Sequence, residues 1–258
     1  MSNKIKIINV GLFKRTIAFL IILVGFELIL YKEDYILGIG LIQGISLLFF
    51  NLWVVRFKLK NYETYNKLII PMLFYLGSLA FLVLVPSQIF THLYILIISF
   101  IYTYIVKNIR NVKRYSDNKE LFNMNDIYIL ITAFLICSGI FGIYIFLYLP
   151  MWLLLSLSLI LISLLIFQFF WNEGILSRKN VIYIPILALV FCELTWALSF
   201  WPTGFASRGI VLFAVFYFII GIIKLHLNNR FNHISIQKYI YVTIAVLALV
   251  LSTTKWYY

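Results

Sequence analysis

Three ionisable side chains, Glu27, His92 and Glu193, lie within long apolar runs of the sequence. Their sequence neighbours are mostly Val, Phe, Leu and Ile, which cannot pair with a charge. A charged carboxylate at the centre of a bilayer costs about 2.5–3.5 kcal/mol even on the most lenient insertion scale. Such a group therefore either bonds to a neighbouring helix or handles a ligand or a proton. Both interpretations stay open for all three residues.

Glu193 has the most informative surroundings, in the stretch VFCELTWALSFWPTGFASRG of residues 190–209. On a helix, offsets of three, four and seven residues share one face. The face around Glu193 then holds only apolar and aromatic neighbours, namely Leu189, Val190, Trp196, Ala197 and Phe200. Such a face suits an amphipathic ligand with a cationic or hydroxyl head. The alternative is that Glu193 bonds to a neighbouring helix or to Arg208.

The composition identifies the elements that must position these residues. Hydrophobic residues make up 64% of the chain and charged residues 12%, whereas an average soluble protein is roughly 45–50% apolar. Apolar runs of about 20 residues, long enough to cross a membrane as a helix, recur from end to end. The sequence therefore predicts an all-α, polytopic integral membrane bundle, with residues 1–258 forming a single transmembrane domain.

The apolar runs predict nine transmembrane spans. Their expected ranges are 16–31, 35–55, 68–85, 89–106, 127–149, 151–171, 181–200, 209–223 and 239–254.

The distribution of basic residues predicts the orientation of these spans. If the N-terminus is inside, all of the 21 Lys and Arg residues except Lys32, Arg208 and Lys255 belong to inner segments. Positive charge concentrates on the cytoplasmic side because cationic flanks resist translocation. We therefore expect the N-terminus inside, the C-terminus outside, and a location in a bacterial-type plasma membrane. The net charge of +12 belongs to these short connections, so no nucleic-acid partner is expected.

This orientation predicts a polar pocket open to the outer leaflet. Five polar or charged residues fall toward the outer ends of their spans, namely Glu27, Gln88, His92, Glu193 and Arg208. We expect Glu27, His92 and Glu193 to be its ligand-binding or proton sites, with Trp196 and Arg208 closing its mouth.

The common catalytic and metal-binding motifs are absent from the sequence. No G-x-S-x-G, H-E-x-x-H or phosphate-binding glycine loop occurs. His226 and His233 stand seven residues apart without a neighbouring carboxylate or cysteine. We therefore assign no catalytic residue and expect no metal and no cofactor.

The acidic pair Glu33-Asp34 follows the first span, on its expected outer side. In this position it resembles multi-span glycosyltransferases that use polyprenyl-phosphate sugars, which keep an acidic pair just after their first span. The resemblance implies that one carboxylate acts as a base toward an acceptor hydroxyl. The chain departs from that family in its first outer loop, which is short, and in having no large outer domain.

A second resemblance runs from Glu193 through the eighth span, in ELTWALSFWPTGF and the aromatic run around Tyr217. This part is similar to uncharacterised small polytopic membrane proteins of bacteria, and it implies no known activity.

These observations lead to one expected function and two alternatives. We expect an integral membrane protein that binds or transports a small or amphipathic molecule through the outer pocket. The first alternative is a structural or accessory subunit without its own ligand, with membrane lipids and a partner membrane protein as its contacts. The second is the glycosyltransferase-like enzyme, with Glu33 and Asp34 as its acids.

Overall fold

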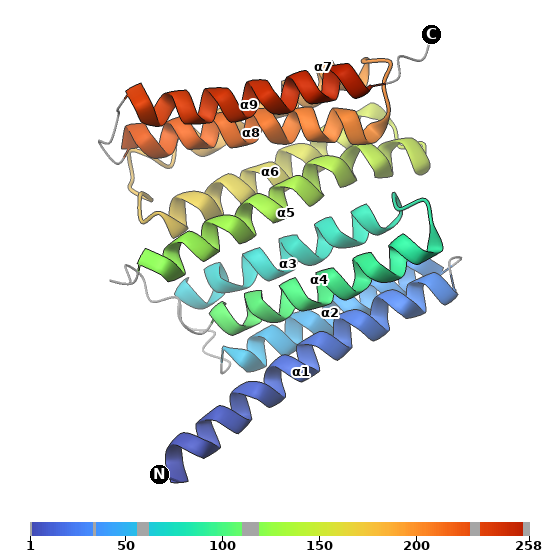
Figure 1. Cartoon of the computed structure of the whole chain (residues 1–258), viewed down its shortest axis with the longest axis vertical. Coiled ribbons are helices and arrows are strands. Elements are labelled where there is room, and N and C mark those ends of the chain that lie inside the picture. Colours follow the sequence, from blue (N-terminus) through green and yellow to red (C-terminus); the bar gives the residue numbers. More distant parts are fainter. Residues whose placement is uncertain (1, 33–34, 56–61, 110–118, 228–232, 255–258) are drawn as a thin grey trace. The chain divides into compact units, whose positions relative to one another are not determined.

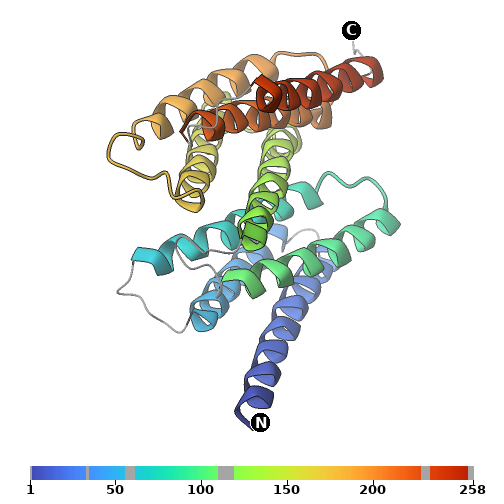
Figure 2. The ribbon, with the colours of Figure 1, turned by 60° about the vertical axis from the view of Figure 1, so that its left-hand side comes forward.

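The computed structural model describes residues 2–32, 35–55, 62–109, 119–227 and 233–254. All regular structure in these residues is helical, in nine α-helices. The chain divides into two compact units, Met1–Leu121 and Phe122–Tyr258, and each unit is described by itself. Figures 1 and 2 show the helices of both units. The prediction that residues 1–258 form one domain stays a prediction.

Unit 1 is a closed arrangement of four helices (blue to green in Figure 1). Helix α1 packs against both α2 and α4, and α3 also packs against both α2 and α4, so each helix has two neighbours. The bounds are α1 Ser2–Tyr31, α2 Ile36–Val54, α3 Tyr62–Leu82 and α4 Gln88–Ile109.

Unit 2 contains the other five helices. Helix α7 packs on α6 and α8, and α9 packs on α8. Helix α5, which begins at the border of the two units, meets α8 where the rings of Phe134 and Phe213 lie 5.6 Å apart. The bounds are α5 Lys119–Phe146, α6 Met151–Asn172, α7 Tyr183–Ser199, α8 Phe205–Leu227 and α9 His233–Thr253.

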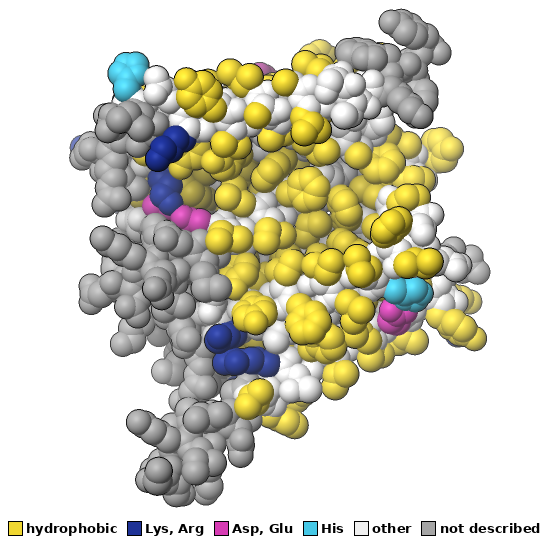
Figure 3. Space-filling view, in the orientation of Figure 1, with side chains coloured by type: hydrophobic (Ala, Val, Ile, Leu, Met, Phe, Trp, Pro, Cys, Tyr) yellow, Lys and Arg dark blue, Asp and Glu magenta, His cyan; other side chains and the backbone are white. Residues whose placement is uncertain are grey.

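The helices expose many large apolar side chains and bury several polar ones within an apolar core, unlike those of a soluble protein. On α2, Gln43 is 5% exposed and Asn51 is fully buried, whereas Leu41 and Ile42 are 68% and 71% exposed. The space-filling view in Figure 3 shows hydrophobic side chains over the middle of the helices. Such a surface is stable only where the surroundings are themselves apolar, as in the hydrocarbon core of a bilayer.

Seven of the described helices are long and apolar enough to cross a membrane. The other two are α7, which has 17 residues, and α1, whose apolar part carries Lys14, Arg15 and Glu27. The predicted all-helical membrane class is therefore confirmed. That all nine helices cross the membrane, and on which side the termini lie, stay predictions.

Several helices extend beyond the apolar runs that predict them. Helix α5 begins at Lys119 rather than at 127, and α8 covers Phe205–Leu227 rather than 209–223. Polar residues at a helix end still complete backbone hydrogen bonds of the type N–H(i) to O=C(i−4), so hydropathy alone ends a helix too early. As a result Asp126 and Lys224, which the sequence placed at a span boundary and in a connection, belong to helices.

A buried amide joins three helices of unit 1. The Gln43 Nε2 atom donates to the carbonyl oxygens of Ile21, at 3.1 Å, and Ile22, at 3.3 Å, on α1. The Tyr75 hydroxyl of α3 donates to the Gly40 carbonyl oxygen of α2 at 2.7 Å. Gly25 leaves room for this amide, because a Cβ atom there would lie 2.2 Å from Gln43 Cδ. Interhelical hydrogen bonds of this kind hold membrane helices in register.

In unit 2 a glycine brings α8 directly against α5. A Cβ atom on Gly209 would lie 2.5 Å from the Cα atom of Ser138 and 2.8 Å from its Oγ atom. Small residues allow this close approach of two helix backbones, which is a principal source of packing energy in membranes.

We therefore expect Gly209→Ala to destabilise the protein by about 1–3 kcal/mol, because the methyl group meets backbone that must move. Thermal unfolding of the purified protein in mild detergent measures the effect. Gly38→Ala is the matched control, since no atom lies within 4 Å of a Cβ atom at that helical position. Removing a helical glycine there is neutral or stabilising by up to about 1 kcal/mol. Equal unfolding temperatures for the two variants would contradict the proposed contact.

Candidate functional site

Glu27 and His92 form a hydrogen-bonded pair between α1 and α4. The His92 Nδ1 atom lies 2.9 Å from Glu27 Oε1. The side chains are 56% exposed for His92 and 38% exposed for Glu27. The carboxylate that the sequence leaves without a partner in its own apolar run therefore finds one on the neighbouring helix.

Antiparallel packing of α1 against α4 brings this pair together. The rings of Phe19 and Phe100 lie 5.0 Å apart across the two helices. Glu27 follows Phe19 by eight residues and His92 precedes Phe100 by eight, so the register set by the rings places the two polar residues opposite each other. The Thr91 hydroxyl donates to the Ser87 carbonyl oxygen at 2.9 Å, at the start of α4.

A cavity of about 520 Å³ opens beside the pair, at one end of unit 1. Its walls come from the end of α1, the start of α2, the end of α3 and the start of α4. Glu27, Gln88 and His92 line it with polar groups, and apolar side chains such as Leu30 and Leu82 line the rest. This volume lies in the range of small-molecule sites, and polar and apolar groups share its wall. We call it the Glu27–His92 pocket.

Three of the expected pocket residues, Glu27, Gln88 and His92, therefore lie together. The other three, Glu193, Trp196 and Arg208, belong to unit 2, so their membership of the same pocket stays a prediction. The alternative acids Glu33 and Asp34 lie outside the described residues.

In unit 2, the predicted residues lie toward the C-terminal end of α7 and at the start of α8. Glu193 and Trp196 are exposed on α7, and the Trp196 ring meets Phe200 edge to face at 5.6 Å. Arg208 lies in the first turn of α8, half-buried, and its buried Nε atom has no hydrogen-bond partner in the described part of the chain. No described contact joins Glu193 to Arg208.

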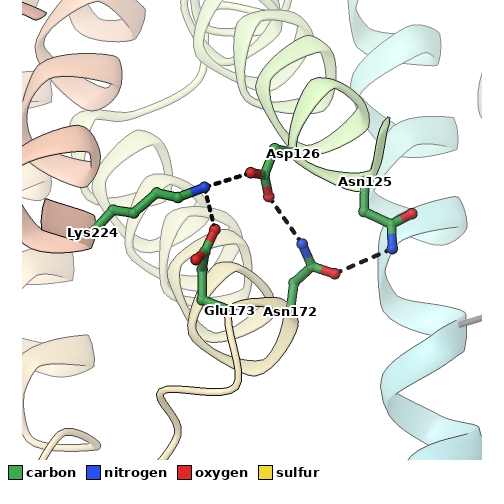
Figure 4. Close-up of polar contacts among 5 residues, drawn as sticks. All are labelled: Asn125, Asp126, Asn172, Glu173 and Lys224. Carbon is green, nitrogen blue, oxygen red and sulfur yellow. Dashed lines mark hydrogen bonds and ion pairs between the residues drawn. The ribbon is translucent and has the colours of Figure 1, made fainter. Parts of the chain in front are cut away.

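A second polar site, which the sequence interpretation missed, joins α5, α6 and α8. Figure 4 shows the Lys224 ammonium between two carboxylates. Its Nζ atom lies 2.6 Å from Asp126 Oδ2 and 2.5 Å from Glu173 Oε1. Asn172 Nδ2 donates to Asp126 Oδ1 at 3.0 Å, and Asn125 Nδ2 donates to Asn172 Oδ1 at 3.2 Å. These five residues are the Lys224 cluster.

The Lys224 cluster is far better shielded from solvent than the Glu27–His92 pair. The side chain of Glu173 is only 1% exposed, that of Asp126 20% and that of Lys224 26%. Charges held this close with little water interact strongly, and each would be costly to leave without a counter-charge. The cluster is therefore a strong link between helices.

A signal for this cluster was present in the sequence. Asp126, Glu173 and Lys224 border apolar runs that alternate in direction, which puts all three at the inner ends of their spans. Two acids and one base at the same depth can neutralise each other. The signal was hidden because all three residues fall just outside the hydropathy-based spans, where charged residues are usually solvated.

The described residues contain no group of three or more His, Cys, Asp and Glu side chains placed to hold a metal ion. His226 lies near the end of α8 and His233 is the first residue of α9.

The profile of one protein family, described as "Protein of unknown function (DUF5656)", matches residues 40–253. The match includes His92 and the whole Lys224 cluster, and Glu27 precedes it. This finding is consistent with the expected resemblance to an uncharacterised family. No curated protein and no solved structure matches the chain.

Replacing Lys224 by Met leaves two carboxylates without the ammonium between them. A fully buried charge stripped of its partner costs roughly 3–5 kcal/mol, and the partial exposure of Asp126 and Lys224 lowers this to about 2–3 kcal/mol. Thermal unfolding in detergent near pH 8 measures the loss. The control is Lys179→Met, because Lys179 is exposed in the connection after α6. It should change the free energy of unfolding by under about 0.5 kcal/mol. An equally small effect at Lys224 would show that the cluster is solvated.

Proposed function

The chain belongs to the DUF5656 family of proteins of unknown function, and on that premise we propose its function from the geometry of unit 1. The protein is a multi-pass membrane protein that binds, or binds and transports, a small amphipathic molecule in the Glu27–His92 pocket. One observation carries the proposal. In a chain with 12% charged residues, a partly exposed carboxylate–imidazole pair lines a cavity of about 520 Å³.

The polar groups and the apolar side chains that line this pocket define the class of ligand. A cationic or hydroxyl head group can replace the His92 imidazole as the hydrogen-bond donor to Glu27. Hydrogen bonds to a charged group contribute about 1.5–3 kcal/mol. The apolar part of the same molecule then lies against Leu30, Leu82 and Val83, which line the cavity. A purely polar solute would leave those side chains without a partner, so an amphipathic molecule fits best.

The topology that goes with this proposal has nine crossings in the plasma membrane, with the N-terminus inside and the pocket open to the outer leaflet. It is supported by the concentration of Lys and Arg in alternate connections, with only Lys32, Arg208 and Lys255 outside them. Helix α7 has 17 residues, about 25 Å at 1.5 Å per residue. A helix of that length crosses a hydrocarbon core of about 30 Å only with local thinning or help from its flanking residues.

We expect Glu27→Gln to release the ligand that the wild-type protein retains through purification in mild detergent. Losing the charged acceptor should lower its amount about tenfold or more, the factor that corresponds to the 1.5–3 kcal/mol of a charge-assisted hydrogen bond. Mass spectrometry of small molecules and lipids released from the two proteins measures the change. His92→Gln should give a smaller decrease, because the carboxylate remains.

Lys179→Gln, which changes an exposed charge away from the pocket, is the control and should retain the ligand. Glu193→Gln tests whether unit 2 contributes, since a decrease there would add Glu193 to the pocket. The same background lipids in all of these samples would contradict the proposal and favour an accessory subunit that acts through a partner membrane protein.

The topology makes a separate prediction. An alkaline phosphatase fused after Tyr258 should be active, and a green fluorescent protein at the same place should not fluoresce, because the nine crossings put this end outside. The opposite pair of results should follow for fusions in the 110–118 connection, which the topology places inside. Fluorescence of the fusion after Tyr258 would contradict this topology and would mean that the orientation is reversed or that the chain has one span fewer.

A further inference from the structure

The carboxylate of Glu193 lies on the exposed side of α7. It has no hydrogen bond or ion pair with any other residue that the structure describes. Six residues of α7 follow it, so it lies about 9 Å from the C-terminal end of the helix at 1.5 Å per residue. Helix α7 packs on α6 and α8, both of which are long and apolar enough to cross a membrane.

The proposed topology therefore puts Glu193 well inside the apolar layer of the membrane. Carboxylates at such a depth almost always face the interior of a bundle or a water-filled space, or pair with another group. Glu193 points away from its own neighbours α6 and α8, which shows that its partner comes from elsewhere.

The surroundings of Glu193 on this side of α7 are apolar and aromatic. Exposed residues recur there at the helical spacing of three and four, namely Ile186, Leu189, Val190, Trp196, Ala197 and Phe200. From Ile186 to Phe200 they extend over about four helical turns, or about 21 Å. We call Glu193 and these six residues the Glu193 face.

The shape of the Glu193 face fits another helix. It is a row of side chains along a convex helix, and neither the pocket of unit 1 nor the small cavity beside Lys224 includes a residue of α7. Small molecules bind in concave sites, whereas membrane helices pack against each other over several turns with small residues at the contact. Ala197 lies one turn after Glu193 and leaves room for a side chain that reaches the carboxylate.

Two features of the face favour a cation on that helix. A carboxylate forms its strongest hydrogen bonds with Lys and Arg side chains, which carry the opposite charge. Trp196 lies three residues after Glu193 and is 52% exposed, with its ring held edge to face against Phe200 at 5.6 Å. A cation beside Glu193 therefore also lies near an indole ring, and Trp attracts cations more strongly than Phe or Tyr does.

A second copy of this chain fits the face poorly. Two copies related by a twofold axis present the same face to each other, which puts the two Glu193 carboxylates at the same depth. Their like charges repel each other, most strongly where water is scarce. The Glu193 face contains no basic side chain that would compensate.

We propose that the Glu193 face binds a transmembrane helix of a different membrane protein, and that this helix carries a Lys or Arg side chain opposite Glu193. The site belongs to unit 2 and stands independently of the ligand pocket in unit 1.

Photocrosslinking in the cells that naturally make the full-length protein tests the proposal. Benzoylphenylalanine replaces either Leu189, which is 56% exposed on the Glu193 face, or Ile160, which is 53% exposed on α6 and serves as the control. We expect one covalent adduct of defined mass from position 189 and none from position 160. Mass spectrometry should identify the captured chain as a membrane protein with Lys or Arg inside an apolar segment. No adduct from position 189, or a captured chain without such a residue, would overturn the proposal.

Glu193→Gln in the position-189 protein tests the role of the charge. The yield of adduct should fall about tenfold or more, because the basic side chain of the partner loses its counter-charge. Immunoblots should show equal amounts of the two proteins in the membrane, since Glu193 has no described contact to lose within its own chain. Glu193→Lys together with Glu in place of the partner's basic residue should restore the yield. An unchanged yield in Glu193→Gln would contradict the proposal.

The remaining outcomes separate this site from other occupants of the face. Glu27→Gln should leave the adduct unchanged, so the ligand proposal and this one fail or succeed separately. An adduct with twice the mass of the chain would identify a second copy, and a crosslink within one chain would identify a contact between its own helices. Either result would overturn the proposal. So would a Glu193→Gln variant that loses the retained ligand and keeps the adduct, because Glu193 would then serve the ligand.

Discussion

Several polar groups buried in this apolar bundle find partners on neighbouring helices, and these bonds select which helices meet. Water is absent from the hydrocarbon core, so an unpaired group there is costly. Gln43 donates to carbonyl oxygens of α1. Asn51 donates to the Tyr102 hydroxyl at 2.8 Å, and Tyr94 donates to the Ser78 carbonyl oxygen at 2.9 Å. Each of these bonds joins two different helices of unit 1. The apolar side chains supply close packing, and the polar ones select which pairs of helices pack.

The same constraint explains why the two charged sites differ in kind. In unit 1 the Glu27–His92 pair lies at a helix end beside a wide cavity and is partly open to solvent. Such a pair contributes little to stability, typically under about 1 kcal/mol, so its presence in an apolar span needs another explanation, and ligand binding provides one. In unit 2 the Lys224 cluster is nearly closed and joins three helices. There the charges stabilise the contacts between α5, α6 and α8, because each carboxylate has the ammonium as its counter-charge.

The class of the fold was accessible from the sequence, and the sites only in part, for identifiable reasons. Long apolar runs predict membrane helices because the bilayer thickness fixes their length. Alternating spans predict a similar depth for Glu27 and His92, whereas their contact is visible only in the structure. Glu193 was expected to join them, but hydropathy gives depth and direction only, and says nothing about which helices are neighbours. The Lys224 cluster was missed because its charges lie just outside the apolar windows, with Asp126 near the start of α5, Glu173 directly after α6 and Lys224 in the last turn of α8.

The two charged sites carry different weight for the proposed function. The Lys224 cluster pairs its charges within unit 2 and is accounted for as a link between helices. The Glu27–His92 pair lies beside a cavity in unit 1 and contributes little as a fastening. The family match extends over His92 and the whole Lys224 cluster. The proposal of ligand binding therefore rests on the contacts and the cavity of unit 1.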